Sequence, residues 1–361
     1  MRQVVGAERG RMGRVVGMSS YQIPSQSPSL EELARRQQNV VTASQLRASG
    51  VPTRVVSGHC REGGPWQRLL PRVYLLQEGE PTPEQRMWAA LLYAAQNGRE
   101  EGRRDGAVIT GAAALALYGF SSAPRLPAVT GVEVLVPRQR RLKDAGEVRI
   151  RRTERELVAR SVHGLACAPV ARAVADTLRE WTDAGVFDTG EVPTRQLRAV
   201  LREALAKTEP GCTLKELLAE LREAGLLGEE RVRAAVDELL AAERESVLGR
   251  IGDLVDEWLL PAPLAGPELR MPGGTFVAVP DLYWPAAGVA VEVDSELRCV
   301  SEGEAAWVRG GQHRMEYLGV RVVYVSGARL AAEPDAVGGE LREAFLAGGT
   351  DVVELMVAGH G

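Results

Sequence analysis

A long stretch of helical periodicity, residues 193–260, constrains the fold more than any other feature of this 361-residue chain. Leucine and valine recur there every three or four residues, as they do on the buried face of amphipathic helices. On either side, short apolar runs alternate with turns that contain glycine and proline, a pattern typical of strands mixed with helices. We therefore predict an α+β protein of several domains, in which a helical linker joins two mixed α/β regions.

Changes in composition indicate where the domains begin and end. Residues 1–28 have little apolar pattern and end in a proline- and serine-rich sequence, so we expect a disordered extension. Ordered structure is expected from Ser29, which is an N-cap residue with Glu32 three positions later. The remaining expected units are a winged helix-turn-helix at 29–78, an α/β middle domain at 79–192, the helical linker at 193–260, a C-terminal mixed α/β domain at 261–348 and a tail at 349–361.

Composition argues against several classes of protein. No apolar run reaches the ~18 residues of a membrane-spanning helix, and residues 1–20 lack the apolar core of a secretory signal. The cysteines form no C-x-x-C pair, which argues against a zinc ribbon and against a disulfide framework. They are Cys60, Cys167, Cys212 and Cys299. We therefore expect a protein of a reducing, bacterial-type cytoplasm.

Charge is divided unevenly along the chain. Residues 1–160 carry 25 Lys and Arg against 15 Asp and Glu, a net charge of +10, whereas residues 161–361 carry 19 against 33, a net charge of −14. Such an asymmetry is expected when one end of a protein binds a polyanion. The alternative is chance in an arginine-rich composition. The chain has no lysine after Lys215.

Residues 29–78 have the pattern of a winged helix-turn-helix. Three helices are expected at 30–38, 43–48 and 53–60, with a turn at 39–42 between the first two, and strand-like runs follow at 66–70 and 72–76. The third helix of this fold enters the major groove, so its candidates for DNA contact are Arg54, Ser57, His59 and Arg61. Candidates for phosphate contacts are Arg35, Arg36, Arg47, Arg68 and Arg72. The same fold also serves as a dimerisation or docking module.

The middle domain alternates helices and strands. Helices are expected at 82–95, 111–118 and 169–181, and strands at 108–110, 131–136 and 147–151. Residues 138–143, between the last two strands, form the most basic stretch of the chain. This stretch either extends a DNA-binding surface or is a solvated hairpin loop.

Carboxylates interrupt an apolar run near the C-terminus, residues 288–295. Side chains alternate along a strand, so Glu292 and Asp294 share one face. Asp281 ends the preceding expected strand, 275–283, across a short turn. Three converging carboxylates repel one another unless they hold a cation, and oxygen ligands suit Mg²⁺, which can activate water for phosphodiester hydrolysis. The alternative is a solvated strand end for Glu292 and Asp294, with Asp281 capping a turn.

The C-terminal region resembles the very-short-patch-repair-like nuclease domain of the PD-(D/E)XK superfamily. The matching residues are Val279-Pro280-Asp281-Leu282-Tyr283-Trp284-Pro285 and Val289-Ala290-Val291-Glu292-Val293-Asp294-Ser295. A helix expected at 302–318, a strand at 319–326 that is a parallel neighbour of 288–295, and a helix at 335–346 complete a β-β-α-β-α unit. The resemblance implies a restriction-endonuclease-like mixed sheet and a metal-dependent DNA endonuclease.

The front of the chain is similar to the AbiEi-type antitoxins of abortive-infection (type IV) toxin–antitoxin systems. The matching pieces are residues 33–37, 41–46 and 72–74 in the winged helix, and residues 109–114 and 132–138 in the middle domain. This resemblance implies a DNA-binding antitoxin or transcriptional regulator, with a cognate toxin as partner. The two resemblances together cover most of residues 29–348.

The C-terminal domain departs from the nuclease pattern at the positions that carry catalysis. The superfamily's lysine is replaced by Asp294, a histidine of the related family by Cys299, and an upstream helical glutamate by Gly249. Cationic or titratable replacements are Arg298, His313 and Arg314. Arginine is a poor general base because it stays protonated, and His313 is either the base or a helix-surface residue. We therefore expect an acidic site that is weak or inactive as a catalyst.

Three functions remain open from the sequence. The first is a cytoplasmic DNA-binding protein, antitoxin- or regulator-like, that carries a degenerate endonuclease-like domain. The second is a Mg²⁺-dependent DNA endonuclease in which Asp281, Glu292 and Asp294 hold the metal and His313 is the base. The third is a non-catalytic interaction protein whose acidic half docks a basic partner such as a cognate toxin.

Overall fold

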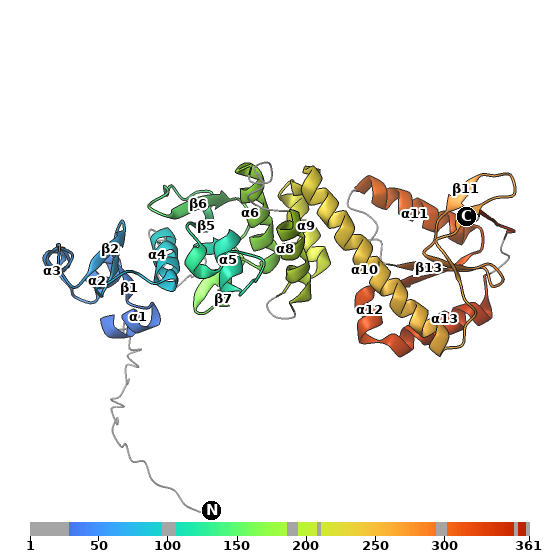
Figure 1. Ribbon diagram of the computed structural model, residues 1–361, viewed down its shortest axis with the longest axis horizontal. Helices are drawn as coiled ribbons and strands as arrows, with labels where there is room; N and C mark the ends of the chain where they lie inside the picture. Colours follow the sequence, from blue (N-terminus) through green and yellow to red (C-terminus); the bar gives the residue numbers. More distant parts are fainter. Residues whose placement is uncertain are drawn as a thin grey trace, which may run out of the picture.

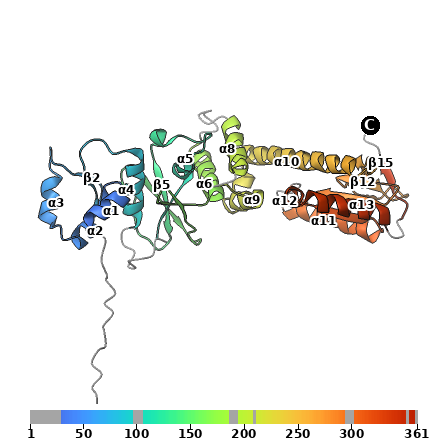
Figure 2. The same ribbon diagram turned by 90° about the horizontal axis from the view of Figure 1, so that it is seen from below.

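The computed structural model describes residues 29–95, 106–185, 194–207, 211–293, 302–349 and 353–358. The elements follow one another along an elongated molecule, from a small N-terminal head through a middle α/β unit and a group of helices to a C-terminal α/β unit (Figure 1). The same order is seen when the molecule is turned by 90° (Figure 2). Within the described residues, none of the helices combines the length and apolar character needed to cross a bilayer.

The head is built from three short helices and a small antiparallel sheet. Its helices are α1 (Leu30–Arg36), α2 (Ala43–Ala48) and α3 (Thr53–His59), and its strands are β1 (Val40–Thr42), β2 (Gln67–Leu70) and β3 (Val73–Leu75), in the order β1-β3-β2. The segment expected as a turn is instead strand β1, because it pairs with β3. Val41, Leu46 and Val56 form the core of the head.

The middle unit has a five-stranded mixed sheet covered by helices. The elements are α4 (Pro83–Ala95), β4 (Val108–Thr110), α5 (Gly111–Leu117), a 3₁₀ turn (Leu126–Ala128), β5 (Val132–Pro137), β6 (Val148–Thr153), β7 (Arg160–Val162), β8 (Leu165–Cys167) and α6 (Val170–Asp183). The strand order is β6-β5-β4-β8-β7. Strands β5 and β6 are parallel, so the interpretation of residues 138–143 as a hairpin loop is wrong: the chain returns along the sheet before β6 begins.

Three helices continue the middle unit, and the last of them also enters the C-terminal unit. They are α8 (Thr194–Ala206), α9 (Leu214–Glu223) and α10 (Glu230–Glu257), with a 3₁₀ turn (Leu226–Gly228) before α10. Leu201, Leu217 and Leu239 share one core with the middle sheet and with the head strand β3. The second half of α10 instead contributes Val247 and Ile251 to the C-terminal core. Between these halves, residues 241–246 are exposed except for Arg244, which is half-buried.

The C-terminal unit contains two sheets. Its elements are β9 (Leu264–Ala265), β10 (Glu268–Arg270), β11 (Phe276–Ala278), β12 (Leu282–Trp284), β13 (Val289–Val293), α11 (Glu302–Tyr317), β14 (Arg321–Val325), α12 (Gly327–Ala332), α13 (Pro334–Ala347) and β15 (Met356–Ala358). The sheet orders are β14-β13-β12-β9 and β11-β10-β15. The strand expected at 275–283 is wrong as one element, because the chain breaks at Pro280 and β11 and β12 pair in different sheets.

Strand β13 lies in the middle of the larger sheet and is buried along its length. It pairs with β14 in parallel and with β12 in antiparallel register, so α11 is the crossover that the sequence predicts. Val289, Val291 and Val293 pack in the core that includes α10 and α13. Ala290 packs instead in a second cluster with Met315 of α11. This alternation leaves Glu292 on the α11 side of the sheet.

Candidate functional site

The head presents an arginine surface at the free end of the molecule. Helix α3 lies at the end of the head that is remote from the middle unit in both views (Figures 1 and 2). Val56 anchors α3 in the head core, while Arg54 and Ser57 are exposed on it. The exposed arginines predicted for DNA contact are Arg35, Arg36, Arg47, Arg54, Arg61, Arg68 and Arg72.

Two of these arginines have defined local settings. Arg36 forms an ion pair with Glu32 one turn earlier on α1, and exposed pairs of this kind are weak and easily exchanged for phosphate. Arg72 lies in the turn between β2 and β3 with φ of +64°. Its carbonyl accepts a hydrogen bond from Ala43 N at 2.9 Å. Arg72 therefore connects the wing, which is the hairpin of β2 and β3, to the start of α2.

His59 differs from the other predicted DNA contacts because it is half-buried. Its ring lies edge-on to Trp66, with centroids 4.5 Å apart, and its carbonyl accepts a hydrogen bond from Trp66 N at 3.1 Å. The ring Nδ1 is buried without a hydrogen-bond partner. The side chain packs α3 against the segment that leads into the wing, so it would have to leave Trp66 to reach a base.

The two described acids of the C-terminal site are both buried. Asp281 is 1% exposed and Glu292 is 2% exposed. Asp281 comes directly before β12, where Leu282 pairs with Val291 in antiparallel register, and Glu292 follows Val291 on β13. Asp281 N donates to Val291 O at 3.1 Å. Asp294 lies outside the described residues.

Both carboxylate oxygens of Asp281 accept hydrogen bonds from the protein. Oδ1 accepts from Nε of Arg244 on α10 at 2.7 Å and also from its Nη2. Oδ2 accepts from Val293 N at 2.6 Å. A guanidinium that holds a buried carboxylate in this way neutralises its charge. The sequence predicted no role for Arg244, although Gly249 on the same helix was compared with the nuclease pattern. Nothing in the local sequence distinguishes Arg244 from the other arginines of this helix.

Glu292 lines a small cavity of about 10 Å³ beneath α11. The walls include Phe276, Val308 and Arg314, and Arg314 Nε donates to Val277 O at 2.8 Å. His313 does not line this cavity. Its side chain is 79% exposed, with Nδ1 3.6 Å from Glu316 Oε2, so it occupies the outer surface of α11.

The described residues do not fit a magnesium ion in this arrangement. Mg²⁺ takes octahedral oxygen ligands and keeps several of its waters, whereas the cavity of about 10 Å³ beside Glu292 has room for about one water and is not lined by Asp281. Asp281 is already bonded to Arg244. In the part of the chain that the structure describes, no group of three or more His, Cys, Asp or Glu side chains could hold a metal ion.

A buried charge network crosses the middle sheet. Arg151 Nε donates to Oε1 of Glu133 at 2.8 Å, while Glu133 Oε2 is buried without a partner. Burial raises the pKa of Glu133, and the cation of Arg151 opposes this effect. Nearby, Asp176 accepts from Thr110 Oγ1 at 2.6 Å and from Arg172 Nε at 2.9 Å. No sequence pattern indicated these contacts, because the residues come from three separate strands and a helix.

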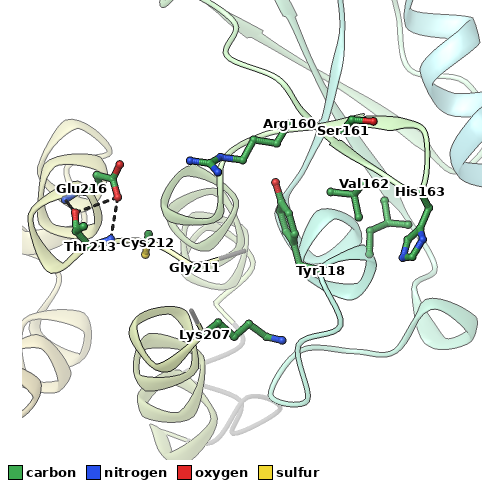
Figure 3. A pocket seen from close by; sticks show the side chains of 11 residues that line it. Tyr118, Arg160, Ser161, Val162, His163, Lys207, Gly211, Cys212, Thr213 and Glu216 are labelled. Atoms are coloured by element: carbon green, nitrogen blue, oxygen red, sulfur yellow. Dashed lines mark hydrogen bonds between the residues drawn. The ribbon is translucent and has the colours of Figure 1, made fainter. Parts of the chain in front are cut away.

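A polar groove of about 930 Å³ lies beside α5, β7 and the start of α9. Figure 3 shows Tyr118, Arg160 and Lys207 around this groove, with Glu216 turned toward Thr213. Tyr118 Oη donates to Ala168 O at 2.8 Å. Thr213 and Glu216 form the capping box of α9. Arg160 is exposed, whereas Lys207 is half-buried, with its ammonium 5.4 Å from the centroid of the Phe120 ring. Tyr118, Thr213 and Glu216 make hydrogen bonds that stabilise the fold.

Comparison with known proteins gives no family for this chain. A scan against protein-family models finds no match, and a search of the curated proteins finds none either.

Proposed function

We propose that this protein binds DNA through its head, as an antitoxin-like or regulator-like protein, and that its nuclease-like domain does not cleave. The observation that carries the proposal is the exposed arginine surface around α3 and the wing, at the free end of the molecule. A helix that projects from the end of a domain can enter a groove of duplex DNA without steric conflict with the rest of the chain.

The composition of the surface supports two kinds of contact. Arg54 and Ser57 are exposed on α3, where they can hydrogen-bond to base edges. Arg68 is on β2 and Arg72 is in the turn between β2 and β3, where they can meet phosphates. Phosphate contacts give affinity and salt dependence, and base contacts give sequence preference.

The Arg244–Asp281 pair supports the non-catalytic half of the proposal. A carboxylate that is bonded on both oxygens has little capacity left for a metal ion. A Mg²⁺-dependent endonuclease is the second candidate function, favoured by the burial of two carboxylates, Asp281 and Glu292, on adjoining strand segments. A cognate toxin as a protein partner is proposed from the antitoxin resemblance alone.

Fluorescence anisotropy with the full chain tests DNA binding. The probes are a random-sequence duplex and the DNA upstream of the protein's own gene, each titrated at several salt concentrations. We expect Arg68→Ala to reduce the salt slope by about one, and Arg54→Ala to weaken binding to a preferred site by about 1–3 kcal/mol. The control is Arg250→Ala, an exposed residue of α10, which should leave binding unchanged. Absence of binding, or binding that is indifferent to salt, would refute the proposal.

A plasmid-nicking assay separates the two candidate functions. The full chain and Glu292→Gln are incubated with supercoiled plasmid, with and without Mg²⁺. We expect no Mg²⁺-dependent nicking from either protein. Nicking by the unmodified chain that disappears in Glu292→Gln would establish the endonuclease instead.

A further inference from the structure

A cavity of about 260 Å³, open to solvent, lies where the wing of the head packs against the middle unit. Strand β2 supplies one wall with Leu69 and Leu70, and α4 supplies Ala89. Val132 of β5 and Val148 of β6 form the opposite wall. Apart from Arg86 and Glu147 at the edge, the lining side chains are aliphatic or proline, so the space offers a ligand mainly apolar contact.

A β-bulge turns two consecutive leucines toward this cavity. The pairing of β2 with β3 passes from Arg68–Tyr74 directly to Leu70–Val73, so Leu69 is the additional residue. Neighbouring residues of a regular strand point to opposite faces, and a bulge re-aims a side chain. Both Leu69 and Leu70 therefore line the space.

The charged groups at the edge form a weak pair. Arg86 Nη1 lies 3.5 Å from Glu147 Oε2, with side chains 43% and 51% exposed. Exposed ion pairs of this kind contribute little to stability. An acidic group on a ligand can therefore replace Glu147 as the partner of Arg86 at small cost.

We propose that this cavity binds a small, flat, apolar molecule that carries one acidic group. An enclosed apolar cavity of about 150 Å³ accepts benzene, and this open space of about 260 Å³ has room for a molecule of two fused rings that stays partly in solvent. The rings would lie among Leu69, Leu70 and Val148, and the acid would meet Arg86. The ligand would then touch the strand that also carries Arg68.

A link to DNA binding follows from this position and rests on the proposed function. A ligand that contacts β2 and a DNA contact made by Arg68 act on the same strand of the wing. Coupling between two sites is reciprocal, so each ligand changes the affinity of the other by the same factor. Binding of the small molecule itself does not depend on the DNA proposal.

Isothermal titration of the full chain with 2-naphthoate and with 2-naphthol tests the site. We expect both to bind with Kd below about 1 mM, corresponding to about −4 kcal/mol. Ala89→Met places a side chain that fills irregular gaps into the cavity and should weaken both compounds by at least about tenfold. Arg86→Gln should weaken 2-naphthoate by up to about fivefold and leave 2-naphthol unchanged. The control is Arg149→Gln, an exposed arginine of β6 outside the lining, which should bind as the unmodified protein does.

Three outcomes would overturn the inference or one part of it. If neither compound binds, or if both bind Ala89→Met undiminished in a folded protein, the site does not exist as proposed. If Ala89→Met fails to fold, the binding of 2-naphthoate to Arg86→Gln tests the site instead. Equal binding of 2-naphthoate to Arg86→Gln and to the unmodified protein would contradict the contact between Arg86 and the acid. DNA affinity that is unchanged by saturating 2-naphthoate would refute the coupling, whereas failure to bind DNA at all would refute the proposed function and leave the cavity site standing.

Discussion

Arg244 of α10 and Asp281 at the start of β12 form an ion pair that joins the shared helix to the C-terminal sheet. The Asp281 carboxylate has a fully buried side chain, whereas the Arg244 side chain is one-third exposed. The pair therefore places one charge in the protein interior and leaves part of its partner in water. Removal of the cation leaves a buried carboxylate without its main counter-charge.

Replacing Arg244 by methionine should lower the free energy of unfolding by about 2 kcal/mol, the range of hydrogen bonds to charged groups. Urea unfolding measures the change. Arg250→Met on the exposed surface of the same helix is the matched control and should change it little. Asp281→Asn combined with Arg244→Met should cost less than the sum of the single changes, because the two side chains are in contact. Additive costs would contradict the pairing.

Gly338 and Gly339 in α13 should respond in opposite directions to alanine. A Cβ on Gly338 would overlap the indole ring of Trp258, whereas a Cβ on Gly339 would lie 3.7 Å from it, an ordinary contact. Gly338→Ala should lower the free energy of unfolding by about 1–3 kcal/mol, and Gly339→Ala should raise it by up to about 1 kcal/mol through helix propensity. Thermal unfolding of both variants gives the comparison. Equal effects would mean that Trp258 moves freely.

Glu133 should make stability fall as pH rises above about 4. Burial raises the pKa of this carboxyl in the folded protein. A group with a raised folded pKa contributes stability that is complete below its unfolded pKa and is lost as pH rises through its folded pKa. Glu133→Gln removes this titration, so the free energy of unfolding of the unmodified protein should fall relative to the variant as pH rises above about 4.

Urea unfolding at several pH values measures this difference. Glu78→Gln, which changes an exposed glutamate of the head, is the control and should keep the profile of the unmodified protein. A difference that grows in favour of the unmodified protein as pH rises would contradict the expected sign.

Cys167 and Cys212 should resist alkylation in the folded protein. Burial raises the pKa of each thiol to about 12, so the reactive thiolate is a fraction of about 10⁻⁴ at pH 8. Iodoacetamide followed by peptide mass spectrometry should find both unmodified in native protein and both modified in urea. Rapid modification of native Cys212 would show that its surroundings open in solution.

Local sequence patterns predicted the individual helices and strands better than their pairing. Helix α2 occupies the expected residues, and α4 ends where expected, because capping residues and periodicity act over a few neighbours. The alternation of Val289, Val291 and Val293 correctly indicated a buried strand. The break at Pro280 and the parallel pairing of β5 with β6 depend on partners distant in the chain, which periodicity does not report.

The candidate site illustrates the same limit at single residues. Spacing on the strands predicted that Asp281 and Glu292 come together, and both are buried, Asp281 directly before β12 and Glu292 on the neighbouring strand β13. The partner of Asp281 is Arg244, which precedes it by 37 residues on a helix whose orientation is fixed by two separate cores. No local pattern reveals such a contact, and it is the contact that bears most on whether the acids act as ligands.

Helix α10 makes the stability of the middle unit and that of the C-terminal unit depend on the same helix. Its first half completes the core of the middle unit and its second half completes the core of the C-terminal unit. A polypeptide cut within residues 241–246 would give each fragment only half of this helix, and a fragment with the whole helix would expose one of its apolar faces to water. Isolated halves of this protein should therefore aggregate and be poorly soluble, and either one is best studied inside the intact chain.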